Sequence, residues 1–199
     1  GRMRQILDDL NIDYKEASGE AAFYGPKLDI QIKNVHGKED TLITIQIDFQ
    51  LAERFGMTYV DAEGQTKYPY VIHRTSIGCY ERTLALLLEK YAGALPTWLM
   101  PEQVRVLPIS DRLIDDAKKV EEQLSRAGIR VSCDTRSEKV GYKIREAQLE
   151  KIPYMLVIGD KEVEEGTVSV RSRKEGDLGS MPVEGFLSKI LQEIATKAK

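Results

Sequence analysis

The sequence has few of the residues on which several large protein classes depend. Its 199 residues include two cysteines, Cys79 and Cys133, which form no CxxC pair. A disulfide framework is therefore not expected, and a reducing cytoplasm is the expected location. The two histidines, His36 and His73, stand alone, so no local histidine motif predicts a metal site.

Long apolar runs and a surplus of one charge are also missing. The longest apolar stretches, 84–88 and 155–158, are far too short to cross a bilayer, so no membrane association is expected. We expect no signal peptide either. The 29 Lys and Arg residues nearly balance the 32 Asp and Glu residues, giving a net charge of −3. This argues against coating nucleic acid by charge alone, but it allows a local RNA-binding face.

The spacing of apolar residues changes near residue 100, which predicts two domains, 1–99 and 102–199. Pro96 and Pro101 interrupt regular structure between them and indicate a short, stiff connection. The first domain should contain a short helix, two antiparallel hairpins and a long helix. Their predicted ranges are 4–10, then 28–33 with 43–49, then 57–60 with 67–73, and finally 76–91.

The second domain alternates strands and helices, which is typical of an α/β architecture. The predicted strands are 104–109, 129–133, 155–159 and 167–172, and the predicted helices are 111–127, 137–151 and 182–198. Ser137 or Asp134 is available to cap the second of these helices. The apolar strand 155–159 has the composition of a buried central strand.

Polar residues alternate with apolar ones along the first predicted hairpin. Asp29 and Gln31 share one face of the first strand, and Thr44, Gln46 and Asp48 share one face of the second. If the two faces coincide, they offer amide and carboxylate groups to a small polar ligand. The alternative is the solvent-facing side of an ordinary sheet.

Three further segments contain candidate ligand-binding side chains. Tyr24 and Lys27 flank a Gly-Pro turn, where a hydroxyl and an ammonium group would suit an anion. His73 ends a strand, and Gly78 and Arg82 have the spacing of one helix face, which makes Arg82 a candidate phosphate ligand. A surface turn, a structural histidine and a salt-bridge arginine are the alternatives.

Taken in order, these segments closely resemble bacterial threonyl-tRNA synthetases, and the resemblance covers nearly the whole chain. The motifs are GEAAFYGPKLD (19–29), IQIDF (45–49), VIHR (71–74), GCYER (78–82), PTWL (96–99), VGYKIRE (140–146) and IPYMLVIGDKE (152–162). The resemblance implies an α+β chain. Its first part would belong to the antiparallel-sheet catalytic domain of a class II synthetase, and its second part would be an α/β anticodon-binding domain with a mixed sheet flanked by helices.

The resemblance also implies roles for residues of the first part. Gly78 to Arg82 resembles the third signature motif of class II synthetases, with Arg82 on the ATP phosphates and Gly78 and Cys79 at the substrate. His73 matches one of three ligands of a zinc ion that binds threonine, and Mg²⁺ would accompany ATP. The remaining matches, which line the threonine and ATP pocket, are Tyr24, Lys27 and Gln46.

In the second part, Glu162 and Arg171 match positions that read anticodon bases, and Lys139 and Arg145 are expected nearby. Two positions depart from the family pattern. Thr41 stands where a glutamine usually lies near the nucleotide, and Ser137 stands where an asparagine often helps to read the anticodon.

The other two zinc ligands and the first two signature motifs are expected upstream of residue 1. The complete enzyme would be a homodimer that activates threonine with ATP and transfers it to tRNA(Thr), and the chain alone is expected to be inactive. The alternative is a stand-alone, non-catalytic tRNA- or RNA-binding module. A nucleotide-binding oxidoreductase is not supported, because no GxGxxG turn follows a strand.

Overall fold

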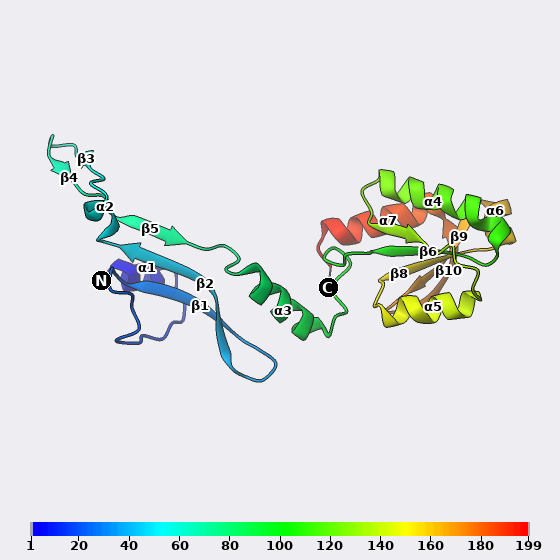
Figure 1. Cartoon of the computed structure of the whole chain (residues 1–199), viewed down its shortest axis with the longest axis horizontal. Helices are drawn as coiled ribbons and strands as arrows, with labels where there is room; N and C mark the ends of the chain where they lie inside the picture. The colour runs from blue at the N-terminus through cyan, green and yellow to red at the C-terminus, as the bar shows by residue number, and fades with distance from the viewer. Residues whose placement is uncertain (1, 199) are drawn as a thin grey trace. The chain divides into compact units, whose positions relative to one another are not determined.

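The computed structural model describes residues 2–198. It divides the chain into two compact units, one up to Ala85 and one from Leu86 onward (Figure 1). The domain limits 1–99 and 102–199 stay a prediction. No helix within residues 2–198 is both long and apolar enough to cross a membrane.

The first unit is built on a three-stranded antiparallel sheet in the order β1-β2-β5. It contains α1 (Arg2–Asp9), β1 (Lys27–Lys33), β2 (Glu39–Asp48) and β5 (Val71–Arg74). In the β1–β2 ladder, Lys27 lies opposite Gln46 and Asp29 lies opposite Thr44. The hairpin is therefore confirmed, and the polar faces of its two strands coincide.

The second predicted hairpin is wrong in its extent. Only β3 (Tyr59–Val60) and β4 (Thr66–Lys67) pair with each other, whereas β5 pairs with β2. The predicted strand 67–73 is interrupted at Pro69, which has no amide hydrogen to donate to a ladder. The short helix α2 (Leu51–Arg54) was not predicted.

The long helix α3 (Tyr80–Tyr91), within which the division between the two units falls, begins four residues later than the predicted start at residue 76. Gly78 has a φ of +75°, which a right-handed helix does not contain. The prediction that Gly78 and Arg82 share a helix face is therefore wrong. A Cβ atom on Gly78 would lie 2.2 Å from the carbonyl oxygen of Leu42, so this close approach requires glycine.

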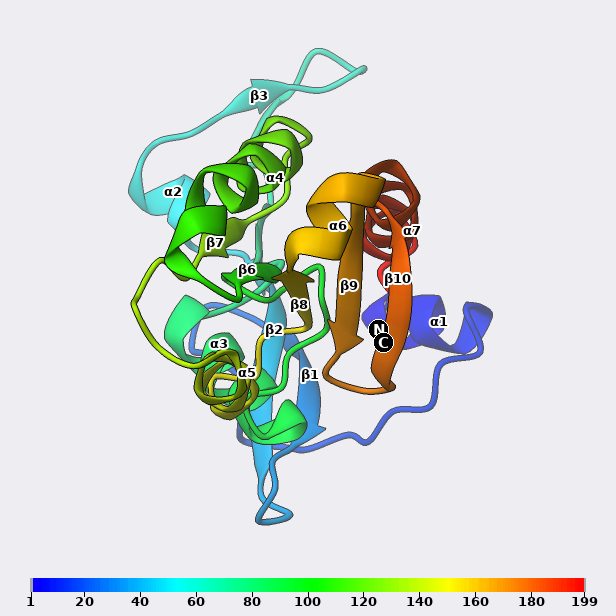
Figure 2. The same ribbon diagram turned by 90° about the vertical axis from the view of Figure 1, so that its right-hand side faces the viewer.

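The second unit has a mixed five-stranded sheet in the order β10-β9-β8-β6-β7, and the labelled strands follow one another in this order across Figure 2. β6 (Val104–Pro108), β7 (Val131–Cys133) and β8 (Tyr154–Ile158) are parallel to one another. β9 (Thr167–Ser172) and β10 (Gly176–Pro182) complete the sheet as antiparallel strands.

Helices cover both faces of this sheet. α4 (Ile114–Arg126) and α7 (Val183–Ala195) pack on one face, and α5 (Val140–Leu149) packs on the other (Figures 1 and 2). The short helices η1 (Asp111–Leu113) and α6 (Asp160–Glu165) follow β6 and β8. The predicted α+β fold class, with a mixed sheet flanked by helices, is confirmed. Lys139, rather than Ser137 or Asp134, occupies the cap position of α5.

Residues 94–100 belong to the second unit although they form no helix or strand. Leu95 and Met100 are buried in it. The guanidinium group of Arg173 donates to the carbonyl oxygens of Ala94 and Leu95, and that of Arg130 donates to the carbonyl oxygen of Met100. The segment predicted to be a short connection is thus fixed to one unit through its backbone.

Candidate functional site

A depression of about 390 Å³ opens at the end of β2 that carries Asp48. It combines aromatic, amide, carboxylate, imidazole and guanidinium groups. Its lining residues are Phe23, Tyr24, Gln46, Asp48, Gln50, Leu51, Arg54 and His73. Three predicted site residues therefore come together here, namely Tyr24, Gln46 and His73.

The backbone positions these three residues. Gln46 lies opposite His73 in the β2–β5 ladder, and the hydroxyl of Tyr24 donates to Oε1 of Gln46 at 2.6 Å. Tyr24 is held by the tight turn that follows it, where a Cβ atom on Gly25 would lie 2.0 Å from the carbonyl oxygen of Ile47. The three side chains form one wall with a phenol, an amide and an imidazole.

Asp48 orients the imidazole. Its Oδ2 atom lies 3.1 Å from Nε2 of His73, and its Oδ1 atom accepts the backbone amides of Gln50 and Leu51. Burial alone would raise the pKa of Asp48, but these two amides and His73 lower it below its usual value. The carboxylate is therefore charged at neutral pH and fixes the plane of the histidine ring.

These residues do not form a metal site by themselves. Residues 2–198 contain no group of three or more His, Cys, Asp or Glu side chains that could hold a metal ion. The residues that line the depression supply one imidazole, that of His73, with the carboxylate of Asp48 in contact with its ring. Proteins commonly orient a histidine ligand of a metal ion in this way. A zinc ion would need its other ligands from outside this set.

Lys27 has a carboxylate partner on its own strand, and its predicted role beside Tyr24 stays a prediction. Its ammonium group pairs with Oδ2 of Asp29 at 2.7 Å, and the hydroxyl of Thr44 donates to Oδ1 of the same carboxylate at 2.8 Å. The carboxylate raises the pKa of Lys27 above its usual value. Lys27 thus lies on the polar face of the sheet, beside the depression rather than in its lining.

The residues that resemble the third signature motif lie toward the other end of β2. Arg82 donates from Nη1 to the carbonyl oxygen of Thr41 at 3.1 Å, and Gly78 lies against the carbonyl of Leu42. Cys79 is exposed, and its thiol donates to Glu81 at 2.9 Å. None of Gly78, Cys79 and Arg82 lines the depression at Asp48.

In the second unit, several polar side chains follow the carboxyl ends of the parallel strands. Ser137, after β7, donates to Asp111, after β6, at 3.2 Å. Lys139 is exposed at the start of α5. Glu162, after β8, accepts the backbone amide of Gly159 at 3.0 Å and the hydroxyl of Ser180 at 3.4 Å. This edge of a parallel sheet is the usual place for ligand contacts.

Arg171 and Glu162 contribute to one face of the sheet. Val168 and Val170 point to the side covered by α4 and α7, so Arg171 points to the side of α5. Ser180, which contacts Glu162, pairs with Ser169 and therefore lies on that same side.

The two residues differ in their position along the strands. Arg171 lies opposite Met155, near the start of β8, whereas Glu162 follows the end of β8. The guanidinium group of Arg171 makes an ion pair of 3.6 Å with Asp177. Arg145 is exposed on α5.

Sequence reasoning gave no role to Lys143, which is 3% exposed. The spacing of Val140, Ile144 and Ala147 predicts a helix face that turns toward the sheet, and Lys143 lies on that face. A charged residue at an apolar position was the signal that could have identified it.

Two family descriptions match the chain, one in each half. The description "tRNA synthetase class II core domain (G, H, P, S and T)" matches residues 2–91. The description "Anticodon binding domain" matches residues 103–193. The order of the two matches agrees with the change of architecture between the two units.

Two similar proteins are both named threonine–tRNA ligase. The threonine–tRNA ligase of Clostridium perfringens (strain SM101) is 66% identical over 195 residues, which are 98% of this chain and 30% of that protein. The threonine–tRNA ligase of Clostridium botulinum (strain Eklund 17B) is 62% identical over 197 residues, 99% of this chain and 31% of that protein. The chain therefore spans about a third of the length of these relatives.

A similar solved structure carries a related name. The crystal structure of the RNA binding domain of threonyl-tRNA synthetase from Cryptosporidium parvum Iowa II matches with a TM-score of 0.87 and 38% identity. The match covers 96% of this chain and 48% of that one.

Proposed function

Because the chain belongs to the threonyl-tRNA synthetase family, as the sequence predicted, we propose that its second unit recognises the anticodon of tRNA(Thr). The first unit would supply part of the threonine and ATP site of a complete threonine–tRNA ligase. That enzyme would activate threonine with ATP, transfer it to tRNA(Thr), and act as a homodimer in the cytoplasm. These activities and partners of the whole protein are part of the proposal.

One observation supports anticodon recognition most directly. Glu162 and Arg171 contribute a carboxylate and a guanidinium group to one face of the sheet. A carboxylate accepts hydrogen bonds from the amino or imino groups of a base, and a guanidinium donates to base acceptors or phosphates. Such groups suit the unstacked bases of an RNA loop. Lys139, at the cap position of α5, and Arg145, within α5, are exposed cations that would contact phosphates.

Binding of the full chain to a tRNA(Thr) transcript tests this proposal against a transcript whose anticodon is exchanged. We expect tighter binding of the first transcript, without added zinc. Glu162→Gln and Arg171→Met should each lower discrimination about tenfold or more, the value of one good base contact. Lys189→Met, an exposed lysine of α7, is the matched control. Equal affinity of the unsubstituted chain for both transcripts would refute the proposal.

For the first unit, we propose that the chain alone does not form threonyl-adenylate. Arg82 would contact the ATP phosphates and Tyr24 and Gln46 the threonine. His73 would be one of three zinc ligands, and the described residues supply no complete metal site. Threonine-dependent ATP–pyrophosphate exchange should be undetectable, with a full-length relative as the positive control. Exchange by the 199-residue chain would contradict this proposal.

The competing proposal is a stand-alone RNA-binding module. The C. parvum structure favours it, because that structure is named as the RNA binding domain of a threonyl-tRNA synthetase. Both proposals predict tRNA binding and no exchange, so the gene distinguishes them. A reading frame that continues upstream into a catalytic half with Cys and His ligands supports the ligase, and one that begins near residue 1 supports the module.

A further inference from the structure

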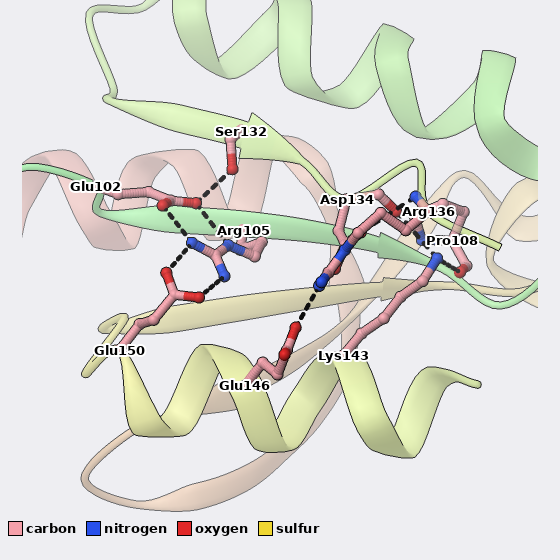
Figure 3. Close-up of polar contacts among 9 residues, drawn as sticks. All are labelled: Glu102, Arg105, Pro108, Ser132, Asp134, Arg136, Lys143, Glu146 and Glu150. Carbon is pink, nitrogen blue, oxygen red and sulfur yellow. Dashed lines mark hydrogen bonds and ion pairs between the residues drawn. The ribbon is translucent and has the colours of Figure 1, made fainter. Parts of the chain in front are cut away.

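Lys143 is a buried cation beneath the edge of the second unit's sheet. Burying an ammonium group costs free energy unless hydrogen bonds replace its water. Here Nζ donates to the carbonyl oxygen of Asp134 at 3.0 Å and to that of Pro108 at 3.3 Å (Figure 3). Pro108 ends β6, and Asp134 directly follows β7. One side chain from α5 therefore holds the ends of two neighbouring parallel strands.

The same residue closes the loop after β7 at both ends. The Nζ atom of Lys143 binds the carbonyl of Asp134, where the loop begins. The backbone amide of Lys143 binds the carbonyl of Lys139 at 3.2 Å, where the loop ends. The ammonium group of Lys143 therefore holds the start of the loop, and its backbone amide makes one of the first hydrogen bonds of α5.

Polar contacts around this loop leave little freedom for it to move. Arg136 donates to Asp134 at 2.6 Å and pairs with Glu146 of α5 at 2.6 Å (Figure 3). Ser137 donates to Asp111 in the loop after β6. The two loops are therefore joined at the surface by this hydroxyl and in the interior by the ammonium group of Lys143.

Apolar side chains of similar volume that replace a buried ion pair as a whole are often neutral or stabilising, so a buried charge is not required for a stable core. Removing only the ammonium group is different, because its carbonyl partners remain buried and lose their donor. The ammonium group fixes the positions of two carbonyl oxygens by donating hydrogen bonds to them, and an apolar side chain would leave both oxygens without this partner. It is too deeply buried to contact RNA itself.

We propose that Lys143 is a positioning residue for tRNA recognition: it fixes the loop that presents Lys139 at the carboxyl edge of the parallel strands. The inference rests on the proposed anticodon recognition. It adds a buried residue that acts through the loop and touches no nucleotide.

The test compares Lys143→Met and Lys143→Arg with the surface control Lys189→Met in the full chain. Each is measured for affinity to the tRNA(Thr) transcript and to the anticodon-exchanged transcript, and for its thermal unfolding. We expect Lys143→Met to unfold at a lower temperature, because two carbonyl oxygens lose their buried donor. In the folded state it should lose about tenfold in affinity for both transcripts, because a phosphate contact of Lys139 carries no sequence information. Lys143→Arg keeps donors for the two carbonyls and should retain most of the affinity, and Lys189→Met should retain all of it.

Hydrogen exchange separates positioning from a general loss of structure. In Lys143→Met, faster exchange should be confined to amides of residues 135–142, with α7 unchanged. Faster exchange throughout the second unit, or unaltered affinity for both transcripts in a folded Lys143→Met chain, would overturn the inference. If Lys143→Met does not fold, Lys143→Arg decides: retained affinity supports the inference, and its loss in a folded chain refutes it. Failure of the proposed function is distinct, because the unsubstituted chain then does not discriminate.

Discussion

Asp48 links His73 to the start of a helix through one carboxylate group. Oδ2 lies 3.1 Å from Nε2 of His73, while Oδ1 accepts the amides of Gln50 and Leu51 at 2.8 Å each. The orientation of the imidazole, the end of β2 and the beginning of α2 therefore depend on the same side chain. A change at Asp48 should affect both stability and the geometry of the candidate site.

Replacing Asp48 by Ala should lower the free energy of unfolding of the first unit by about 1 kcal/mol, since two backbone amides lose their acceptor. Asp48→Asn keeps one acceptor oxygen and should lose less. Urea denaturation followed by far-UV circular dichroism measures the difference. Unfolding curves of both variants that superimpose on the unsubstituted one would contradict the role of this carboxylate.

Gly78→Ala should destabilise the first unit more than Gly37→Ala does. Both glycines have positive φ, +75° and +78°, so each substitution incurs the left-handed penalty of about 1 kcal/mol. Only at Gly78 would the new Cβ atom meet a backbone oxygen, that of Leu42, at 2.2 Å. Thermal unfolding of the two variants separates the steric contribution from the conformational one. Equal losses would show that Leu42 moves away freely.

A chain that begins at Ala94 should be more stable than one that begins at Glu102. The shorter chain lacks the buried side chains of Leu95 and Met100, each worth about 1.5 kcal/mol or more. It also leaves Arg173 without two of its carbonyl partners. Thermal unfolding followed by far-UV circular dichroism suits the comparison, because the only tryptophan lies in the deleted segment. Equal unfolding temperatures would show that the segment contributes nothing.

The second unit should lose stability in acid partly through Glu150. The guanidinium group of Arg105, bound to Glu150 and Glu102, holds the pKa of Glu150 below its usual value. A carboxylate with a lowered folded pKa stabilises the fold above its unfolded pKa, about 4.3, and this contribution disappears as pH falls through the folded pKa.

Glu150→Gln should therefore reduce the difference in unfolding free energy between neutral and acidic pH. Glu122→Gln is the control, because Glu122 belongs to an exposed ion pair with Arg126, and such pairs contribute little. Denaturant unfolding across a pH series gives the comparison. An acid dependence of Glu150→Gln identical to that of the unsubstituted chain would refute the expectation.

Strand pairing in the first unit could be predicted because the alternation of side chains carries the signal. Period-two patterns located β1 and most of β2, and the coincidence of their polar faces followed once the register placed Asp29 opposite Thr44. The partner of β5 could not be found this way. The apolar pattern of β5 is compatible with pairing to β3 or to β2, and only Pro69 indicated that the predicted hairpin ends before β5.

Two elements of the second unit had no usable pattern. β10 has the sequence GDLGSMP, whose glycines and proline hide its alternation, and a bulge between Asp177 and Gly179 shifts its register. α6 has six residues, and its start is stabilised by the contact of Glu162 with the amide of Gly159. Both elements pack against β9, so their structure depends on tertiary context rather than on local preference.

The sequence predicted which residues lie together in a candidate site better than it predicted which partners their side chains contact. Tyr24, Gln46 and His73 do lie together. The ammonium group of Lys27 was predicted to be available to an anionic ligand, but it pairs with Asp29, which is two residues away on the same face. A side chain with several possible partners contacts the one that lies nearest in the folded structure, and the spacing of residues in the sequence does not give these distances.

The attachment of residues 94–100 has an evolutionary consequence. Arg130 and Arg173 hold main-chain oxygens, and every residue type offers the same oxygen. The bonds at Ala94 and Trp98 therefore do not depend on which side chain these positions carry, whereas a single change at either arginine removes several bonds together. Selection on the attachment thus acts on two arginines that lie elsewhere in the sequence, as well as on the buried side chains of Leu95 and Met100.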